Sequence, residues 1–509
     1  MNKLISTLLA IFLLLSACNT TTNVDSLQRS TPEKEGVSSQ GILNFLEAVE
    51  QTGEEWHSFM ILRHGKVIAE GWWNPYTPEL KQTVYSTSKT FTSTAIGFAV
   101  SENLLSVDDR VISFFPNLLP DTVSPYLAQM SVQNLLSMTA GQNPETISIA
   151  HGDEWIKHFL ATPVVDEPGT QFLYNSIATY MLSAIIQEVT GQRILDYLYP
   201  RLLEPLAIRD ADWEISPEGV NTGGWGLRVR TEDMAKLGQL YLQKGMWNGK
   251  QLLPESWIEE ATTAKIIQKP EITPDERAKD DWAQGYCYQI WRCRHNAFRA
   301  DGAFGQYIIV MPDQDAVVAI QADMRHLQKA TDLVWDYLLP AIHDKALPED
   351  KATAAALKQK LASLSIAPPK GAGSDLQPFL EKETSYMFTD SGQEEKISIH
   401  FAGDTCFLNW KNYKLVFGNE QWIAGETLKP VPNLIPNKAS FKEFPPFKTC
   451  GSYCRSDEKT LSLSLKYMES PHTERFELDF VGDTILAKVS NSMNYSSYIE
   501  SVGVKISDE

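Results

Sequence analysis

The apolar positions near the start of the chain predict a helix followed by a hairpin. In residues 38–51, Ile42, Phe45, Leu46 and Val49 recur with the period of a helix. The next stretch, SFMILRHGKVIAEGWW, has the composition of two strands on either side of His-Gly, a pair that suits a tight turn. We therefore expect one amphipathic helix and then two antiparallel strands.

Helical patterns dominate the middle of the chain, and strands return after them. Helices are predicted over residues 172–189 and from Thr231, where Thr-Glu-Asp caps a run that stops at Gly245. QYIIVM and AVVAIQ then predict two strands around a turn at 312–315, and a last amphipathic helix covers roughly 327–342. This order predicts a mixed α/β (α+β) domain.

The pattern changes near residue 345. Residues 346–375 begin with an alanine-rich stretch that could form one short helix, and they end in APPKGAGSD, which is typical of a linker. Residues 376–509 are predicted as a small all-β meander or barrel, because TLSLSLKY alternates almost perfectly. Two similar segments, 397–408 and 476–487, each predict a hairpin around a Gly-Asp turn.

Composition limits the classes of function. The 509 residues suit two or three domains, and 43% apolar and 21% charged residues are ordinary for a soluble globular protein. The formal net charge of −19 argues against a nucleic-acid partner, since phosphate binding needs concentrated Lys and Arg.

The N-terminus predicts export. MNK carries a positive charge, and a nearly unbroken apolar run of twelve residues follows up to Leu15. Twelve residues are too few to span a bilayer, which takes about 20, but they suit a signal peptide. LSAC, ending at Cys18, resembles a bacterial lipobox, in which the cysteine becomes the acylated first residue.

We therefore expect a signal peptide over 1–17, a polar tether over 18–29 and a membrane anchor through a lipid on Cys18. The protein would then be an exported lipoprotein of the bacterial cell envelope, on its periplasmic or surface face. The alternative is an ordinary signal peptide that happens to end near a cysteine.

Five cysteines remain when Cys18 is set aside, so at least one is unpaired within the chain. A glycine turn could bring Cys450 and Cys454 together in CGSYC. Cys287 and Cys293 could pair only across a turn, because six extended residues span about 20 Å. None of the five has the spacing of a metal site, so no metal and no cofactor is expected.

The sequence VYSTSKTFTS contains the candidate chemistry. Ser86 and Lys89 lie three residues apart where an extended stretch meets a predicted helix, so the amine can reach the hydroxyl. A serine needs an adjacent base to act as a nucleophile, and a desolvated lysine can serve. The alternative is that Ser86 only caps the helix. The same spacing recurs at Ser456 and Lys459, in the β-rich region.

Three motifs in order resemble the class C β-lactamase-like serine hydrolases of the β-lactamase and penicillin-binding protein superfamily, which include esterases, D-amino-acid peptidases and 6-aminohexanoate-dimer hydrolases. They are STSK at 86–89, YNS at 174–176 and ADG at 300–302. The likeness covers about 30–345. It implies a serine β-lactamase-like fold, with an antiparallel sheet flanked by helices and an all-helical region, followed here by the small all-β domain.

The resemblance implies roles for the first two motifs. Ser86 is similar to the acylated nucleophile and Lys89 to its base. Tyr174 is similar to the second proton carrier, which it could be if the charge of the lysine lowers its pKa. Ser176 could hydrogen-bond the lysine or a substrate amide. The alternative for Tyr174 is an aromatic side chain packed in the core.

The third motif implies both an oxyanion hole and a departure from the β-lactamases. The backbone N–H groups of Ser86 and Ala303 would bind the oxyanion, and Gly302 would let the substrate lie close to the strand. Asp301 stands where β-lactamases carry a Lys or His near the substrate carboxylate. It would repel a carboxylate if it pointed inward, or it could point outward from the strand end. In both cases the cation is missing.

We therefore expect a lipid-anchored serine hydrolase that acts through an acyl-enzyme on a small-molecule or peptide-like ester or amide, as an esterase, amidase or peptidase rather than a β-lactamase. One alternative is a binding or sensor protein of the same fold without turnover. Another is a structural surface lipoprotein. The β-rich domain could cover the active site, bind a partner or hold the enzyme away from the membrane.

Overall fold

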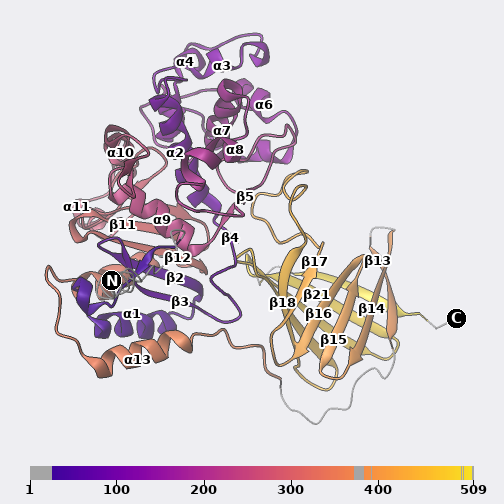
Figure 1. Ribbon diagram of the computed structural model, residues 1–509. Helices are drawn as coiled ribbons and strands as arrows, with labels where there is room; N and C mark the ends of the chain where they lie inside the picture. The colour runs from indigo at the N-terminus through magenta and orange to yellow at the C-terminus, as the bar shows by residue number, and fades with distance from the viewer. Residues whose placement is uncertain (1–25, 372–382, 391–392, 495, 497, 507–509) are drawn as a thin grey trace, which may run out of the picture.

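The computed structural model describes residues 26–371, 383–390, 393–494, 496 and 498–506. Figure 1 shows a mixed helix-and-sheet body formed by the N-terminal two thirds of the chain and a barrel beside it, drawn in orange and yellow. The predicted signal peptide over 1–17 and Cys18 lie outside the described residues. No helix among the described residues combines the length and the apolar content needed to cross a membrane.

A seven-stranded sheet forms the centre of the first body, in the order β1-β3-β2-β12-β11-β10-β9. Neighbouring strands are antiparallel except β1 and β3. The strands are β1 (Gln28–Arg29), β2 (Glu55–Arg63), β3 (Lys66–Trp72), β9 (Trp291–Arg292), β10 (Phe298–Gly302), β11 (Gln306–Met311) and β12 (Ala316–Asp323). The predicted hairpin at His64-Gly65 and the predicted strands at 306–311 and 316–321 are confirmed.

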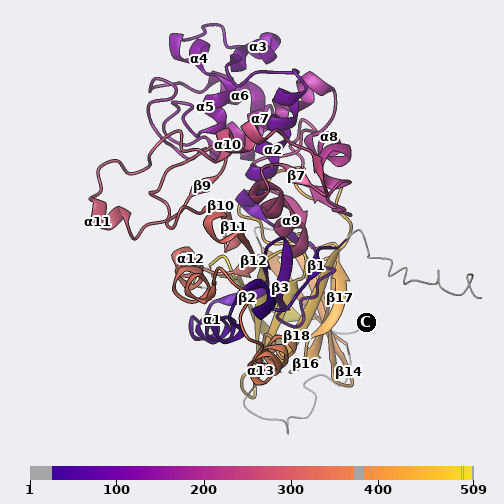
Figure 2. The same cartoon turned by 60° about the vertical axis from the view of Figure 1, so that its left-hand side comes forward.

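Helices cover both faces of this sheet (Figures 1 and 2). One face carries α1 (Ser39–Gln51), α12 (Leu327–Leu333) and α13 (Lys351–Ala362), and the other carries α9 (Thr231–Leu242). Strand β11 shows why both faces are covered. Its Ile308 and Val310 pack in the cluster that contains α9, whereas Tyr307 and Ile309 pack in the cluster that contains α1.

An all-helical region lies beyond one edge of the sheet, at the top of Figures 1 and 2. Its helices are α2 (Ser88–Ser101), α3 (Val111–Phe114), α4 (Pro125–Gln129), α5 (Val132–Leu136), α6 (Trp155–Ala161), α7 (Ser176–Thr190) and α8 (Ile194–Leu198). Helices α10 (Glu255–Thr262) and α11 (Pro274–Arg277) follow later in the chain. Three short strands, β4 (Gln82–Thr83), β5 (Asp212–Trp213) and β6 (Leu227–Val229), form a second small sheet, and β7 (Met246–Trp247) pairs with β8 (Lys250–Gln251).

The structure shifts one predicted helix boundary and assigns the start of the predicted linker to the first body. The helix predicted over 172–189 begins at Ser176, because the side chain of Asn175 accepts a hydrogen bond from the N–H of Ala178 and ends the extended segment there. Residues 346–375, predicted as a linker, contain α13. Its Leu357 is 4% exposed and packs in the cluster that contains α1. The start of this segment is therefore part of the first body.

The C-terminal residues form a barrel of ten strands, which confirms the predicted all-β domain. These are β13 (Thr384–Asp390), β14 (Gln393–Ala402), β15 (Thr405–Trp410), β16 (Tyr413–Asn419), β17 (Ile423–Thr427), β18 (Phe447–Arg455), β19 (Thr460–Tyr467), β20 (Thr473–Val481), β21 (Thr484–Asn491) and β22 (Ile499–Lys505). A parallel pairing of β16 with β18 joins the two ends of the sheet. Both predicted Gly-Asp hairpins are confirmed, as β14–β15 and β20–β21.

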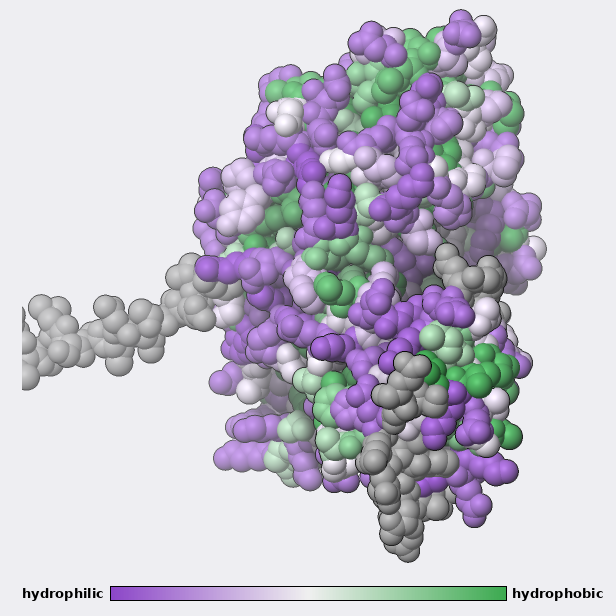
Figure 3. Space-filling view, turned by 90° about the vertical axis from the view of Figure 1, so that its right-hand side faces the viewer, coloured by the Kyte–Doolittle hydropathy of each residue, from purple (hydrophilic) through white to green (hydrophobic). Residues whose placement is uncertain are grey.

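Side chains fill the interior of the barrel. On β19, Leu461, Leu463 and Leu465 point inward and are at most 1% exposed, as the alternating sequence predicts. Trp410 and Phe476 pack edge to face across the core with their centroids 5.2 Å apart. Figure 3 shows that the outer surface on the barrel's side is largely hydrophilic, with small separate apolar areas.

The described cysteines are all unpaired. The suggested pairing of Cys450 with Cys454 is wrong, because CGSYC is part of strand β18 and not a turn. Gly451 is needed there for a different reason, since a Cβ atom would lie 1.9 Å from the carbonyl oxygen of Val416, where β16 meets β18. Cys287 and Cys293 are buried thiols.

The barrel packs directly against the first body. Lys466 Nζ lies 2.6 Å from the carboxylate of Glu55. Glu469 accepts a hydrogen bond from the N–H of Thr83 through its backbone carbonyl, and its carboxylate lies 3.2 Å from the guanidinium of Arg228. Residues 428–446, which connect β17 to β18, extend over the first body (Figure 1). In this segment the side-chain amide of Asn433 donates a hydrogen bond to the carboxylate of Glu214 at 3.2 Å.

Candidate active site

A short turn presents Ser86 between the small sheet and helix α2. The turn spans Tyr85–Thr87 as one 3₁₀ unit, and α2 begins at Ser88 with Thr87 as its N-cap residue. Ser86 therefore precedes the cap, and the interpretation of Ser86 as the helix cap is wrong. Its hydroxyl instead lies 3.0 Å from Lys89 Nζ.

Lys89 is buried, at 1% exposure, among groups that hydrogen-bond its amine. Besides Ser86, Nζ lies 3.1 Å from Ser176 Oγ and 2.7 Å from the carbonyl oxygen of Gly224. Burial lowers the pKa of Lys89 to about 7, although the negative charges of Glu145 and Asp301 act in the opposite direction. A substantial fraction of the amine is therefore neutral near pH 7 and can accept a proton from Ser86.

Tyr174 borders the same two groups. Lys89 Nζ lies 4.8 Å from the centre of its ring, and its hydroxyl makes a hydrogen bond with Ser86. The ring is half-buried and stacks on Trp291 at 5.7 Å, so the alternative of a core aromatic is wrong. The expectation that the lysine lowers the pKa of Tyr174 is also wrong, because desolvation raises it. The hydroxyl thus holds its proton at neutral pH.

Ser176 and Glu145 complete the surroundings of the amine. Ser176 is the first residue of α7, and its N–H donates a hydrogen bond to the Glu145 carboxylate at 3.2 Å. The same carboxylate accepts from the N–H of Ile147 at 2.7 Å, and desolvation raises the pKa of Glu145. Glu145 could not be found from the sequence, since it lies in a loop and in none of the three motifs.

The third motif carries a buried ion pair. The Asp301 carboxylate lies 2.7 Å and 2.9 Å from two nitrogens of Arg299, and both side chains are buried. The alternative that Asp301 points outward is wrong. It points inward, but its charge is paired with Arg299. Residues two apart on a strand share a face, so the spacing of Arg299 and Asp301 in FRADG is a sequence signal for this ion pair, although the pair was not predicted.

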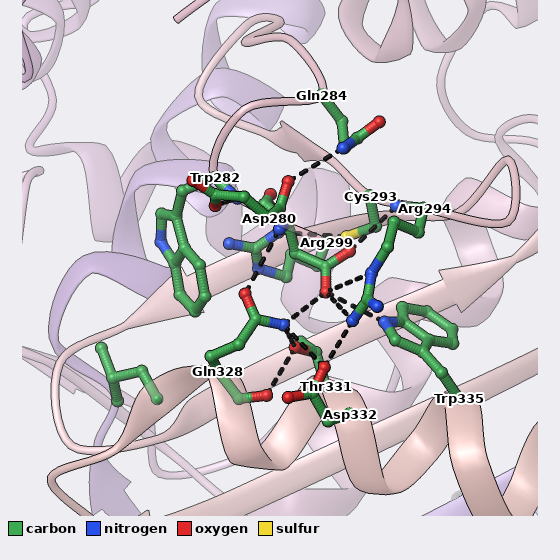
Figure 4. A network of polar contacts seen from close by, with 12 residues as sticks. Asp280, Trp282, Gln284, Cys293, Arg294, Arg299, Gln328, Thr331, Asp332 and Trp335 are labelled. Carbon is green, nitrogen blue, oxygen red and sulfur yellow. Dashed lines mark hydrogen bonds and ion pairs between the residues drawn. The ribbon is translucent and has the colours of Figure 1, made fainter. Parts of the chain in front are cut away.

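A network of polar contacts holds Arg299 in place (Figure 4). The Arg299 guanidinium donates to the carbonyl oxygen of Asp281 at 2.8 Å and lies 3.1 Å from Cys293 Sγ. The Asp281 carboxylate in turn accepts from Arg294 and Trp335. These contacts fix the orientation of Arg299 and thereby the placement of its ion pair with Asp301.

Gly302 brings strand β10 against the Ser86 turn. A Cβ atom at this position would lie 2.3 Å from the carbonyl oxygen of Val84 and 3.1 Å from Thr87 Oγ1. The expectation that Gly302 makes room for the substrate needs correction, because the Ser86 turn occupies that space. Ala303 follows at once and is half-buried. The structure thus places Ala303 and Ser86 on adjoining segments, and the role of their N–H groups stays a prediction.

The charged side chains near Ser86 are not arranged as a metal site. Among residues whose placement is described, no group of three or more His, Cys, Asp or Glu side chains is arranged to share a metal ion. What the cluster offers is a hydroxyl, a buried amine with lowered pKa and a protonated phenol within mutual reach. This set can move a proton away from Ser86 and deliver one to a leaving group.

Comparison with known proteins identifies the family of most of the chain. A family model described as Beta-lactamase matches residues 47–339. The 6-aminohexanoate-dimer hydrolase of Paenarthrobacter ureafaciens is 24% identical over 313 residues, which cover 57% of this chain and 78% of that protein. An uncharacterized protein of Alkalihalophilus pseudofirmus is 22% identical over 263 residues, covering 46% and 72%.

Solved structures show the same fold. A Bacillus anthracis protein described as a candidate 6-aminohexanoate-dimer hydrolase has a TM-score of 0.50 at 19% identity, covering 64% of this chain and 89% of that one. A Bacteroides dorei protein described as a candidate β-lactamase has a TM-score of 0.50 at 16% identity, covering 59% and 99%. At these identities the similarity concerns the fold alone.

The lowered pKa of Lys89 predicts a pH-dependent stability. Its folded pKa of about 7 lies below the ordinary value of 10.5, so between these values the unfolded chain binds more protons and stability rises with pH. Relative to Lys89→Met, which does not titrate, the unaltered protein should gain about 2 kcal/mol between pH 7 and pH 9 in urea unfolding. Lys250→Met, at an exposed lysine, serves as the control. A constant difference between Lys89→Met and the unaltered protein would show that Lys89 stays charged in the fold.

Proposed function

Because the chain belongs to the Beta-lactamase family of serine hydrolases, we propose that it cleaves an ester or amide through an acyl-enzyme on Ser86. The observation that carries the proposal is the buried Lys89 amine, 3.0 Å from the Ser86 hydroxyl and with a pKa lowered to about 7. A serine hydroxyl is a weak nucleophile at neutral pH, and a neutral amine in contact with it is the base that it needs.

In the proposed first step, neutral Lys89 takes the proton of Ser86 as Oγ attacks the substrate carbonyl carbon. The carbonyl oxygen becomes an oxyanion, which the backbone N–H groups of Ser86 and Ala303 would bind. When the tetrahedral species collapses, Tyr174 gives its proton to the leaving group. The ammonium of Lys89 then returns a proton to Tyr174, so the amine is neutral again and the acyl group remains on Ser86.

Water completes the reaction by the reverse route. Tyr174 gives its proton to Lys89 and takes one from the attacking water, the ester bond to Ser86 breaks, and the ammonium of Lys89 returns a proton to Oγ as the acid leaves. Ser176, with its hydroxyl 3.1 Å from Lys89 Nζ, orients the amine in both steps. The Gly224 carbonyl, at 2.7 Å, accepts one amine hydrogen throughout and leaves the lone pair of neutral Lys89 directed to the hydroxyls.

The charges around the site favour an esterase, amidase or peptidase over a β-lactamase. Arg299 is the cation nearest the third motif, but its guanidinium is already paired with Asp301. A substrate carboxylate would therefore meet no free cation at this strand. The relative named as a 6-aminohexanoate-dimer hydrolase supports an amide as one substrate class. The half-buried rings of Phe172, Tyr174 and Trp291 favour an uncharged group beside the scissile bond.

We also propose that the protein is a lipoprotein of the bacterial cell envelope, held by a lipid on Cys18. The support is the sequence alone, namely the short apolar run and the LSAC motif. The polar residues after Cys18 would separate the folded part from the bilayer.

Covalent labelling tests the nucleophile. A fluorophosphonate should add its mass to the peptide that contains Ser86 and to no other, and Ser86→Ala should abolish both labelling and turnover of a chromogenic ester. Ser456→Ala is the matched control, because Ser456 has the same spacing to a lysine but lies exposed in the barrel, where its hydroxyl is 2.6 Å from that of Ser462. Label on another serine would refute the assignment. Labelling of Ser86 without steady turnover would favour the sensor alternative.

Substitution of Tyr174 by Phe tests the second proton carrier. The ring and its stacking on Trp291 remain, while the hydroxyl is lost. We expect kcat to fall by a factor on the order of 10²–10⁴ with little change in KM, measured with an ester that has a poor leaving group. Tyr241→Phe, which removes a buried hydroxyl 2.9 Å from Thr94, should keep its rate. An unchanged kcat in Tyr174→Phe would limit Tyr174 to packing.

Replacement of Cys18 by Ala tests the anchor. The altered protein should appear in the soluble fraction or remain as the unprocessed precursor, and the unaltered protein should sediment with membranes. Cys406→Ala, at a buried barrel cysteine, controls for the loss of a thiol. Membrane retention and normal processing of Cys18→Ala would exclude a lipid on this residue.

A further inference from the structure

A histidine from the barrel lies against the active-site turn. His472, in the connection from β19 to β20, is completely buried at 0% exposure. Its Nε2 is 2.5 Å from the hydroxyl oxygen of Tyr85, the residue directly before Ser86. Its ring also packs edge to face on Phe304, with the centroids 4.7 Å apart. One side chain of the second domain thus contacts both segments that flank the site.

Both contacted residues have backbone conformations that need support. Tyr85 has a φ of 45° and Phe304 has a φ of 63°, in the left-handed region that residues other than glycine rarely adopt. Such a conformation is costly and persists only where the surrounding structure enforces it. Tyr85 immediately precedes Ser86, and Phe304 immediately follows Ala303. The strained positions therefore adjoin the two N–H groups that would bind the oxyanion.

Hydrogen bonding fixes the orientation of His472. Burial lowers the pKa of His472 to about 3, so the ring is neutral at physiological pH. Ser492 donates its proton to the Asp323 carboxylate, and its Oγ lies 3.1 Å from His472 Nδ1. Nδ1 must then carry the hydrogen and donate to Ser492, which leaves Nε2 to accept the hydroxyl proton of Tyr85.

The Tyr85 hydroxyl is held from the other side as well. The backbone N–H of Leu434, in the segment 428–446 of the barrel domain, donates a hydrogen bond to its oxygen. The ring of Tyr85 packs on Phe304 with centroids 5.4 Å apart. The barrel domain thus supplies both hydrogen-bonding partners of this hydroxyl, one donor and one acceptor.

We propose that His472 is a positioning residue of the hydrolase site: by accepting the Tyr85 hydroxyl proton and packing on Phe304, it holds together the two strained segments that present the oxyanion-binding N–H groups. The barrel domain is then a working part of the active site. This inference rests on the proposed role of Ser86. It assigns no chemical step to His472, which contacts no reacting atom.

Two single changes remove the same hydrogen bond from opposite sides. Tyr85→Phe keeps the ring contact with Phe304 and loses the hydroxyl, and His472→Phe keeps an aromatic ring and loses the acceptor. Each should lower kcat and the rate of fluorophosphonate labelling at Ser86 by about 10- to 100-fold, with KM nearly unchanged, because small displacements of oxyanion donors act on the transition state. The double variant should be little slower than either single one.

Two further variants separate positioning from packing. His472→Gln, which can still accept from Tyr85, should recover much of the rate lost in His472→Phe. His400→Phe is the matched control, since His400 is a barrel histidine stacked on Phe407 at 4.7 Å, on strand β14, which pairs with β13 and β15. It should keep the unaltered rate. If His472→Phe fails to fold, Tyr85→Phe alone carries the test.

The outcomes distinguish this inference from the function on which it rests. Normal labelling of Ser86 in the unaltered protein, with unchanged kcat in Tyr85→Phe, would overturn the positioning role and leave the proposed function intact. Rate losses that multiply in the double variant would also overturn it, because they would show two independent effects. If the unaltered protein is not labelled at Ser86, the proposed function fails, and this inference fails with it.

Discussion

The desolvation of Lys89 is the constraint on which the rest of the site depends. The amine is 1% exposed, and its burial lowers its pKa to about 7 against the pull of two carboxylates, Glu145 and Asp301. A free carboxylate nearby would favour the charged ammonium, which cannot act as a base. The surroundings limit that effect. Asp301 is paired with Arg299, and Glu145 accepts two backbone N–H groups, from Ser176 and Ile147.

The need to pair the charge of Asp301 explains the network of polar contacts around Arg299. A buried arginine without its partner would cost several kcal/mol, so Arg299 and Asp301 must be placed together. Arg299 also donates to the backbone of Asp281, and the Asp281 carboxylate holds Arg294 (Figure 4). The network holds Arg299 beside Asp301, whose negative charge acts on Lys89. It thus adjusts the pKa of an amine whose main constraint is its burial.

The elements could be predicted from the sequence wherever a periodic pattern decided the structure. The hairpin at His64-Gly65, the alternating strand β19 and the Gly-Asp turns of the barrel follow from local periodicity and turn chemistry. The Ser86–Lys89 contact follows from helical spacing. Glu145, the Gly224 carbonyl and His472 could not be found this way, because they reach the site through long-range packing. CGSYC was misjudged because Gly451 serves a close approach of strands and not a turn.

Gly302 allows strand β10 to contact the Ser86 turn directly. Because glycine is present there, β10 approaches the Val84 carbonyl so closely that a methyl group would not fit. Thr87 Oγ1 then donates to the backbone of Gln306 at 2.7 Å, which ties the Ser86 turn to β11 as well. These contacts hold the Ser86 turn against the sheet, while His472 of the barrel contacts the Tyr85 hydroxyl of the same turn. Both domains therefore contact the turn that carries Ser86.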